Sequence, residues 1–213
     1  TYEAFTPSEA MAQGRIADSW PVTDPRLLAE RVVEIQPNTN GSGYAAGGTI
    51  VWQWRVWDHL SQDQERSALN YVSNLGDAPG RINLNWYRRS SPTSTRPRFS
   101  DWNHVSGLDY NASLDQVLLT FHGHDELFII DHSATTAQAA TDSGGDWGKG
   151  GDLLYRTGNP QTYGVGGAAQ KRYYIIHHAH WIPAGLADAG KIMVLNNNRQ
   201  RGGGASFSIV EML

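Results

Sequence analysis

Short runs of β-branched and aromatic residues, separated by clusters of Gly, Asn, Asp and Pro, fill most of the chain after residue 30. Apolar runs of about six residues bounded by turn formers are typical of β-strands, whereas amphipathic helices repeat roughly every 3.6 residues. The pattern therefore predicts an almost all-β protein. The predicted strands cover residues 31–35, 49–56, 105–110, 116–122, 127–131, 152–157, 178–182, 191–195 and 206–212.

One short helix is predicted near the N-terminus, over residues 6–13. Thr6 can cap its first turn, Pro7 suits the first helical position, and Glu9 follows the cap by three residues. This spacing is the signature of a capping box, in which the cap and the glutamate each accept a hydrogen bond from the other's backbone N–H. Residues 1–30 are accordingly interpreted as a helix and loop that lead into the first strand.

The order of the predicted strands repeats, which indicates consecutive units of four strands. Residues 103–160 hold one complete unit, residues 177–213 hold most of the next, and residues 31–60 match the last strands of a preceding one. Long insertions at 36–47 and 133–150 fall between the third and fourth strands of two units. Four-stranded meanders that repeat in this way are typical of β-propellers, which have roughly 4 to 8 blades.

The predicted fold is therefore a single partial β-propeller domain over residues 1–213, with about half a blade, one full blade and most of another. An open stack of blades exposes sheet faces and strand edges, so we expect the missing blades from the rest of a longer chain or from another chain, for example in a homo-oligomer. A β-sandwich is the alternative fold, because its strands also recur at short spacing. The repeated insertions favour the propeller.

Composition and charge exclude several classes of protein. The 213 residues are 39% hydrophobic, with 23 Gly and 8 Trp, which is typical of a folded, turn-rich chain. A net charge of -4 and scattered basic residues argue against a nucleic-acid partner. No apolar run reaches the roughly 20 residues of a membrane span. The absence of cysteine excludes disulfides and thiolate chemistry. The first residues lack the features of a signal peptide, which leaves secretion open.

Several segments together carry a resemblance to a known family, namely residues 52–60, 101–104, 130–133, 148–160 and 181–183. Through them the chain resembles bacterial arylsulfotransferase-type propeller proteins over nearly its whole length. The resemblance implies a six-bladed propeller, usually secreted or periplasmic, that moves a sulfuryl group from a phenolic sulfate ester to a phenol acceptor. It also implies that no nucleotide donor or other cofactor takes part.

Histidines at the starts of successive blades are the candidates for this chemistry. His104 opens the first strand of the complete blade and His177 opens the same strand of the next, so both are expected to face a common channel. Histidine can act as nucleophile, acid or cationic donor because its pKa lies near neutrality. By resemblance, His177 matches the family's sulfuryl-accepting histidine and His104 matches a second channel histidine. The alternative for both is a hydrogen-bonding role without reaction.

Two positions depart from the family pattern. Ser106 stands where the catalytic branch has asparagine, and His122 stands where it has arginine. Histidine is charged only part of the time, which weakens the expected stabilisation of sulfate. His122 nevertheless joins His177 and His104 as a predicted catalytic residue. The predicted substrate-binding residues are Ser106, Asn103, His124, His178, His180 and Arg156.

Two His-x-His pairs, at 122–124 and 178–180, would each place two imidazoles on one face of a regular strand. Such pairs can bind transition metals, but the spacing alone is weak evidence and we predict no metal. A metal-dependent hydrolase is therefore the weakest functional alternative. The main alternative is a non-catalytic propeller that binds or assembles partners, which the histidine at position 122 favours.

Overall fold

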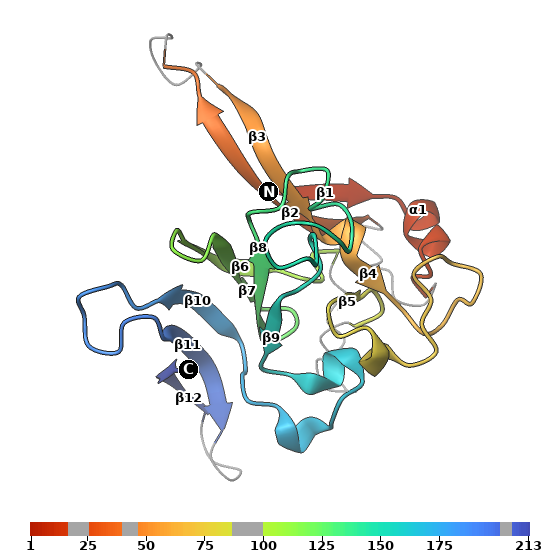
Figure 1. The fold of residues 1–213 in the computed structure, drawn as a ribbon. Coiled ribbons are helices and arrows are strands. Elements are labelled where there is room, and N and C mark those ends of the chain that lie inside the picture. The colour runs from red at the N-terminus through yellow and green to blue at the C-terminus, as the bar shows by residue number, and fades with distance from the viewer. Residues whose placement is uncertain (17–25, 40–46, 87–99, 201–205) are drawn as a thin grey trace.

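The computed structural model describes residues 1–16, 26–39, 47–86, 100–200 and 206–213. Within these ranges, three antiparallel sheets follow one another along the chain, each built from strands that are consecutive in sequence (Figure 1). The first sheet contains β1 (Tyr2–Phe5), β2 (Leu27–Pro37) and β3 (Gly48–Arg55). The second sheet contains β6 (Val105–Asn111), β7 (Gln116–Phe121), β8 (Glu126–Asp131) and β9 (Tyr155–Thr157). The third sheet contains β10 (Ile176–Trp181), β11 (Ile192–Gln200) and β12 (Ser206–Met212).

The smaller elements connect these sheets. A short parallel pair is formed by β4 (Leu60–Ser61) and β5 (Ile82–Asn83). Single turns of 3-10 helix cover Val56–His59, Leu75–Asp77, Pro160–Tyr163 and Ala168–Gln170. Among the described residues, no helix is long and apolar enough to cross a membrane.

The predicted helix is confirmed as α1 (Pro7–Ala12), and its capping box is present. The Thr6 side chain accepts a hydrogen bond from the Glu9 backbone N–H at 3.3 Å, and a Glu9 carboxylate oxygen accepts from the Thr6 N–H at 2.7 Å. Strand β1, which precedes this helix, was not predicted. It pairs antiparallel with β2, so the first sheet has three strands where we expected a lead-in and two strands.

The prediction of an all-β fold with a short helix is confirmed, and the complete unit is a four-stranded meander in the order β6-β7-β8-β9. The bounds differ in places: β2 begins at Leu27 rather than residue 31, and β9 is shorter than predicted. The insertion at 36–47 and the lead-in at 1–30 lie partly outside the described residues. The three sheets do not close into a ring, which is consistent with part of a propeller.

The middle sheet is buried on both faces, and alternation along β7 shows why. Val117, Leu119 and Phe121 point into one hydrophobic cluster, whereas Leu118 points into another. This is the period of two that a strand imposes on its side chains. Every residue of β7 is buried, so the continuous apolar run in the sequence marks a central strand.

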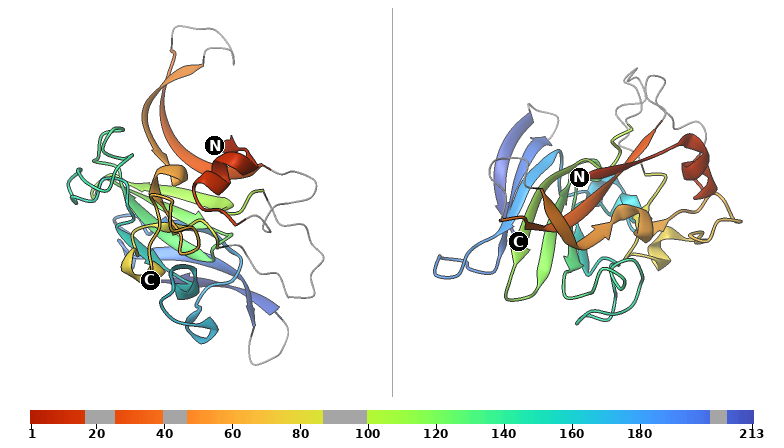
Figure 2. Two further views of the ribbon diagram at one scale, coloured as in Figure 1. Left: turned by 90° about the vertical axis from the view of Figure 1, so that its right-hand side faces the viewer. Right: turned by 90° about the horizontal axis from the view of Figure 1, so that it is seen from above.

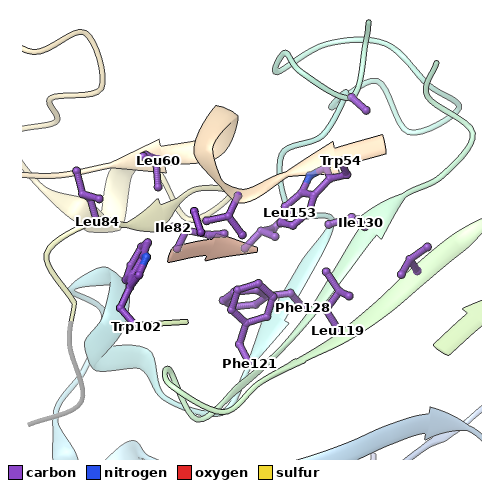
Figure 3. Close-up of a cluster of buried hydrophobic side chains, with 14 of the residues drawn as sticks. Trp54, Leu60, Ile82, Leu84, Trp102, Leu119, Phe121, Phe128, Ile130 and Leu153 are labelled. Carbon is purple, nitrogen blue, oxygen red and sulfur yellow. The ribbon is translucent and has the colours of Figure 1, made fainter. Parts of the chain in front are cut away.

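The larger cluster lies between the first and second sheets and extends to β4 and β5 (Figure 3). Trp54 of β3 and Ile82 of β5 meet Phe121 and Phe128 of the middle sheet there. The smaller cluster joins the second and third sheets, as the two further views in Figure 2 help to follow. Burial of apolar area contributes roughly 25 cal/mol per Å², so both clusters stabilise the packing of the sheets against one another.

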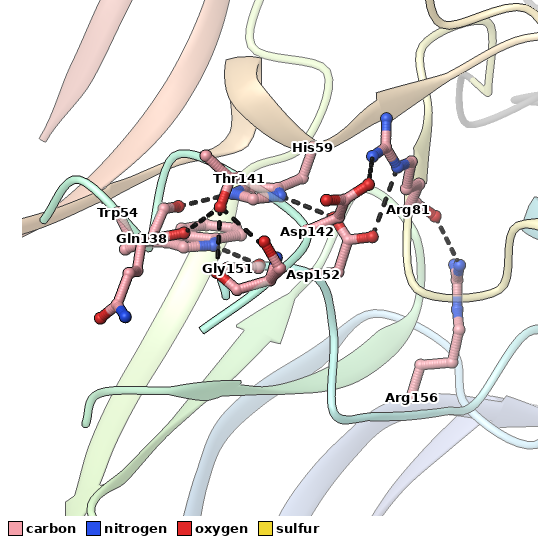
Figure 4. Close-up of polar contacts among 11 residues, drawn as sticks. Trp54, His59, Arg81, Gln138, Thr141, Asp142, Gly151, Asp152 and Arg156 are labelled. Carbon is pink, nitrogen blue, oxygen red and sulfur yellow. Dashed lines mark hydrogen bonds and ion pairs between the residues drawn. The ribbon is translucent and has the colours of Figure 1, made fainter. Parts of the chain in front are cut away.

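A buried polar network fixes the insertion 133–150 and the residues that follow it against the first sheet (Figure 4). The fully buried His59 contacts a carboxylate oxygen of Asp152 through Nδ1 and the carbonyl oxygen of Ala139 through Nε2, both at 2.8 Å. The indole N–H of Trp54 donates to the carbonyl oxygen of Gly151 at 2.7 Å. The long insertion is therefore an integral part of the fold.

Candidate functional site

Three histidines that are distant in sequence lie side by side at the junction of the second and third sheets. The ring centroid of His122 is 5.0 Å from that of His104 and 5.1 Å from that of His177. His104 precedes β6, His122 follows β7, and His177 lies in β10. We call these residues the histidine cluster. It brings together the three residues that the sequence singled out as catalytic candidates.

Antiparallel pairing of β6 and β7 explains why His104 and His122 meet. The start of β6 lies opposite the end of β7, and the backbone N–H of His122 donates to the carbonyl oxygen of His104 at 3.0 Å. The turn that follows His122 passes very close to the loop before His104. A Cβ at Gly123 would lie only 2.1 Å from the carbonyl oxygen of Trp102 in that loop. Glycine at this position lets the two histidine-bearing segments approach each other.

Hydrogen bonds between the second and third sheets bring His177 to the cluster. The hydroxyl of Ser106 donates to the carbonyl oxygen of Ile176 at 3.0 Å, and the N–H of Ala179 donates to the hydroxyl of Thr120 at 3.0 Å. Ser106 was predicted to bind substrate. In the structure its hydroxyl instead joins the two sheets directly before His177.

A carboxylate orients His104. Nδ1 of His104 lies 2.5 Å from a carboxylate oxygen of Asp101, and the two side chains are 51% and 40% exposed, so the cluster is open to solvent. A carboxylate on Nδ1 favours a proton on that nitrogen, which leaves Nε2 to exchange a proton with a ligand. The backbone of His104 has a φ of 48°, in the left-handed region that residues other than glycine adopt only occasionally.

Glu30 is a functional candidate that the sequence did not reveal. Its carboxylate oxygen Oε1 accepts a hydrogen bond from the N–H of Val105, the residue after His104, at 3.0 Å. Burial, with a further contribution from the charge of Asp101, raises the pKa of Glu30 to about 7 although the Val105 N–H opposes this. The long-range bridge between Leu28 and Asp101 places β2 beside this segment, and no local pattern encodes it.

His124, which was predicted to bind substrate, lies in the interior away from solvent. Its side chain is fully buried among the rings of Trp102, Phe121 and Phe128, at centroid distances of 5.4, 5.8 and 6.1 Å. Burial, together with the charge of Arg156, lowers its pKa to about 3. Because β7 ends at Phe121, His122 and His124 lie in a turn and do not share a strand face. The expected His-x-His arrangement is therefore wrong here.

Arg156 is likewise committed elsewhere. Its guanidinium donates to both carboxylate oxygens of Glu126, at 3.0 and 2.6 Å, and to the carbonyl oxygen of Arg81 at 2.9 Å. The Arg156 and Glu126 side chains are 5% and 0% exposed. This buried bidentate pair holds β8 and β9 together, and it leaves Arg156 inaccessible to a substrate.

The remaining predicted residues flank the cluster. Asn103 is fully buried, and its carbonyl oxygen accepts the N–H of Gly123 at 2.8 Å. The rings of His178 and His180 are 5.3 Å apart, and the pairing of β10 with β11 shifts register between His177 and His180. In the part of the chain that the structure describes, no group of three or more His, Asp or Glu side chains is arranged to hold a metal ion.

The fold and the site thus define an open row of antiparallel sheets with an accessible histidine cluster between two of them. Comparison with protein families gives a match to Arylsulfotransferase (ASST) over residues 44–208. This match covers most of the chain, and the protein belongs to the arylsulfotransferase family. Neither the curated proteins nor the solved structures contain a significant match to the sequence.

Proposed function

We propose that the protein transfers a sulfuryl group between phenolic compounds at the histidine cluster, with a phenolic sulfate ester as donor and a phenol as acceptor. Family membership supports an activity of the arylsulfotransferase kind. The observation that carries the proposal is the convergence of His104, His122 and His177 beside Asp101. These side chains can supply a nucleophile, a proton donor and a cationic group within one site.

In the first proposed step, a ring nitrogen of His177 attacks the sulfur of the donor. The N–S bond forms as the bond from sulfur to the aryl oxygen breaks, and the leaving phenolate takes the proton from Nε2 of His104. Protonation of the leaving group by a positioned acid accelerates such steps by roughly 10² to 10⁴. The Asp101 carboxylate holds the His104 ring in the orientation that this transfer needs.

In the second step, the acceptor phenol returns a proton to Nε2 of His104 while its oxygen attacks the sulfur. The N–S bond breaks and His177 recovers its neutral imidazole, so atoms and protons balance without a redox reagent. His122 lies between the other two rings, and when protonated it can donate to the sulfuryl oxygens. His122 thereby stabilises the sulfate charge, which is the role of the arginine that the family's catalytic branch has at this position.

We further propose that additional propeller blades, from a longer chain or from another chain, complete the wall around the cluster. The half-exposed His104 supports this proposal, as do the exposed Val210 and Met212 on β12 at the outside of the third sheet. A secreted or periplasmic location is proposed with it, in keeping with the family.

Phenol release from 4-nitrophenyl sulfate in the presence of a phenol acceptor tests the function, with the protein isolated from its source at its native length. His177→Ala should lower the rate by at least about a thousandfold, because the covalent step is lost. His132→Ala is the control, since His132 follows β8 and contacts Asp115 and Glu34 outside the cluster. Equal rates for His177→Ala and the wild type, or no turnover by the folded wild type, would refute the proposal.

A further inference from the structure

A separate groove opens at the edge of the second sheet, away from the residues of the histidine cluster. Its cavity volume is about 260 Å³, and it is lined by Gln116, Ile129, Trp147, Lys149, Leu154 and Tyr155. The lining therefore combines two aromatic rings, two aliphatic side chains, an amide and a cation. A concave apolar surface with a few polar groups is the usual form of a small-molecule site.

The floor of the groove comes from paired strands. Gln116 of β7 lies opposite Asp131 of β8, and Leu118 lies opposite Ile129, so Gln116 and Ile129 project from the same face of the sheet. Tyr155 of β9 lies opposite Ile129 on the other side. Regular strands thus fix the positions of the floor and of one aromatic wall.

The second aromatic wall is held by the loop before β9. The backbone N–H of Trp147 donates to a carboxylate oxygen of the buried Asp131 at 3.2 Å, and the N–H of Asp146 donates to the hydroxyl of Ser133 at 2.7 Å. Gly148, with a φ of 71°, then turns the chain toward Lys149. A wall anchored in this way lowers the ordering cost of binding a ligand.

Both aromatic side chains of the groove are available to a ligand. Trp147 is 52% exposed and Tyr155 is 48% exposed, so each presents about half of its surface to solvent. Lys149 is exposed as well, and it forms no ion pair with any residue that the structure describes. The lining contains no acidic side chain. The groove therefore offers ring faces and a positive charge without a counterion.

We propose that this groove is a binding site for a planar aromatic ring that carries a sulfonate, sulfate or carboxylate group. The ring would pack against the indole of Trp147 and the phenol of Tyr155, and the anionic group would pair with the ammonium group of Lys149. Charge complementarity and ring stacking together select this ligand class over uncharged aromatics and over small inorganic anions. The inference stands on the groove alone and does not depend on sulfuryl transfer at the histidines.

Calorimetric titration of the native-length protein with 1-naphthalenesulfonate tests the site, with 1-naphthalenemethanol and inorganic sulfate as comparison ligands. We expect the sulfonate to bind more tightly than either comparison. Trp147→Ala should weaken its binding about tenfold through the loss of ring contact. Lys149→Gln should weaken it by about threefold to fivefold, as expected for an exposed ion pair. Both residues are at the surface, so both variants should fold.

Two control variants locate the site. Lys191→Gln removes a lysine that pairs with Asp188 on another loop, and His177→Ala removes the centre of the proposed catalysis. Neither change should alter binding of the sulfonate to the groove. The inference is overturned if Trp147→Ala binds as tightly as the wild type, if Lys149→Gln does so, or if His177→Ala abolishes binding.

Discussion

The buried imidazole of His124 makes the fold sensitive to acid, and replacing it by phenylalanine should remove that sensitivity. Among the residues that the structure describes, neither ring nitrogen of His124 has a hydrogen-bond partner, and aromatic rings surround the side chain. Its pKa falls from the ordinary 6.5 to about 3 in the folded protein. Between these two values the unfolded chain binds a proton that the folded chain does not, so the contribution of His124 to stability falls as the pH falls through this window.

The size of the effect follows from the shift. A difference of about 3.5 pKa units corresponds to roughly 5 kcal/mol over the whole window, at about 1.4 kcal/mol for each pH unit below 6.5. The variant His124→Phe keeps an aromatic ring among Trp102, Phe121 and Phe128 but has no group to protonate. Its extra volume costs about 1 to 3 kcal/mol, and this cost does not change with pH.

Urea unfolding at a series of pH values from about 7.5 to 4.5 measures this difference, because each midpoint together with its slope m yields a free energy of unfolding. The stability difference between wild type and His124→Phe should stay constant above pH 6.5 and then shift in favour of the variant as the pH falls. His178→Phe, at an exposed histidine, is the control and should follow the wild type. Parallel curves for wild type and His124→Phe would refute the account of His124.

Two further predictions concern buried charges. The raised pKa of Glu30 means that the folded state favours its neutral form, so the contribution of Glu30 to stability should fall as the pH rises from 4.5 to about 7, opposite in sign to that of His124. The stability of Glu30→Gln relative to the wild type should therefore increase by roughly 3 kcal/mol at most over this range, and a difference that stays constant with pH would contradict our view of Glu30. Arg156→Met should cost about 3–5 kcal/mol because it leaves Glu126 buried without its cation. Combining it with Glu126→Gln should recover much of that loss in chemical denaturation, and a double variant no more stable than the single one would argue against the ion pair.

Local interactions made part of this structure predictable from sequence. The capping box of Thr6 and Glu9 spans three residues, and the apolar run of β7 reports burial on both faces. The strand order also placed His104 and His177 at equivalent positions of adjacent sheets, although their approach to His122 follows from the pairing of β6 with β7 and the contact with β10.

Long-range contacts explain what the sequence did not show. Glu30 reaches the cluster segment because β2 runs beside Asp101, more than 70 positions later in the chain. His124 and His122 are two residues apart, yet the turn after β7 buries one and leaves the other in the cluster. Arg156 looks like an anion-binding residue until its contact with Glu126 is known. In each case the tertiary environment determines the role of the side chain, and that role differs from the one that the residue type alone suggests.

The most direct test of the proposed function is whether His177 carries the sulfuryl group during turnover. Brief reaction of the native-length protein with an aryl sulfate in the absence of acceptor, followed by peptide mass spectrometry at neutral to alkaline pH, detects the N–S adduct. Our account predicts one added SO₃ on the peptide that contains His177, removed when a phenol acceptor is supplied and absent from His177→Ala. An adduct on another residue, or turnover without any adduct, would contradict it.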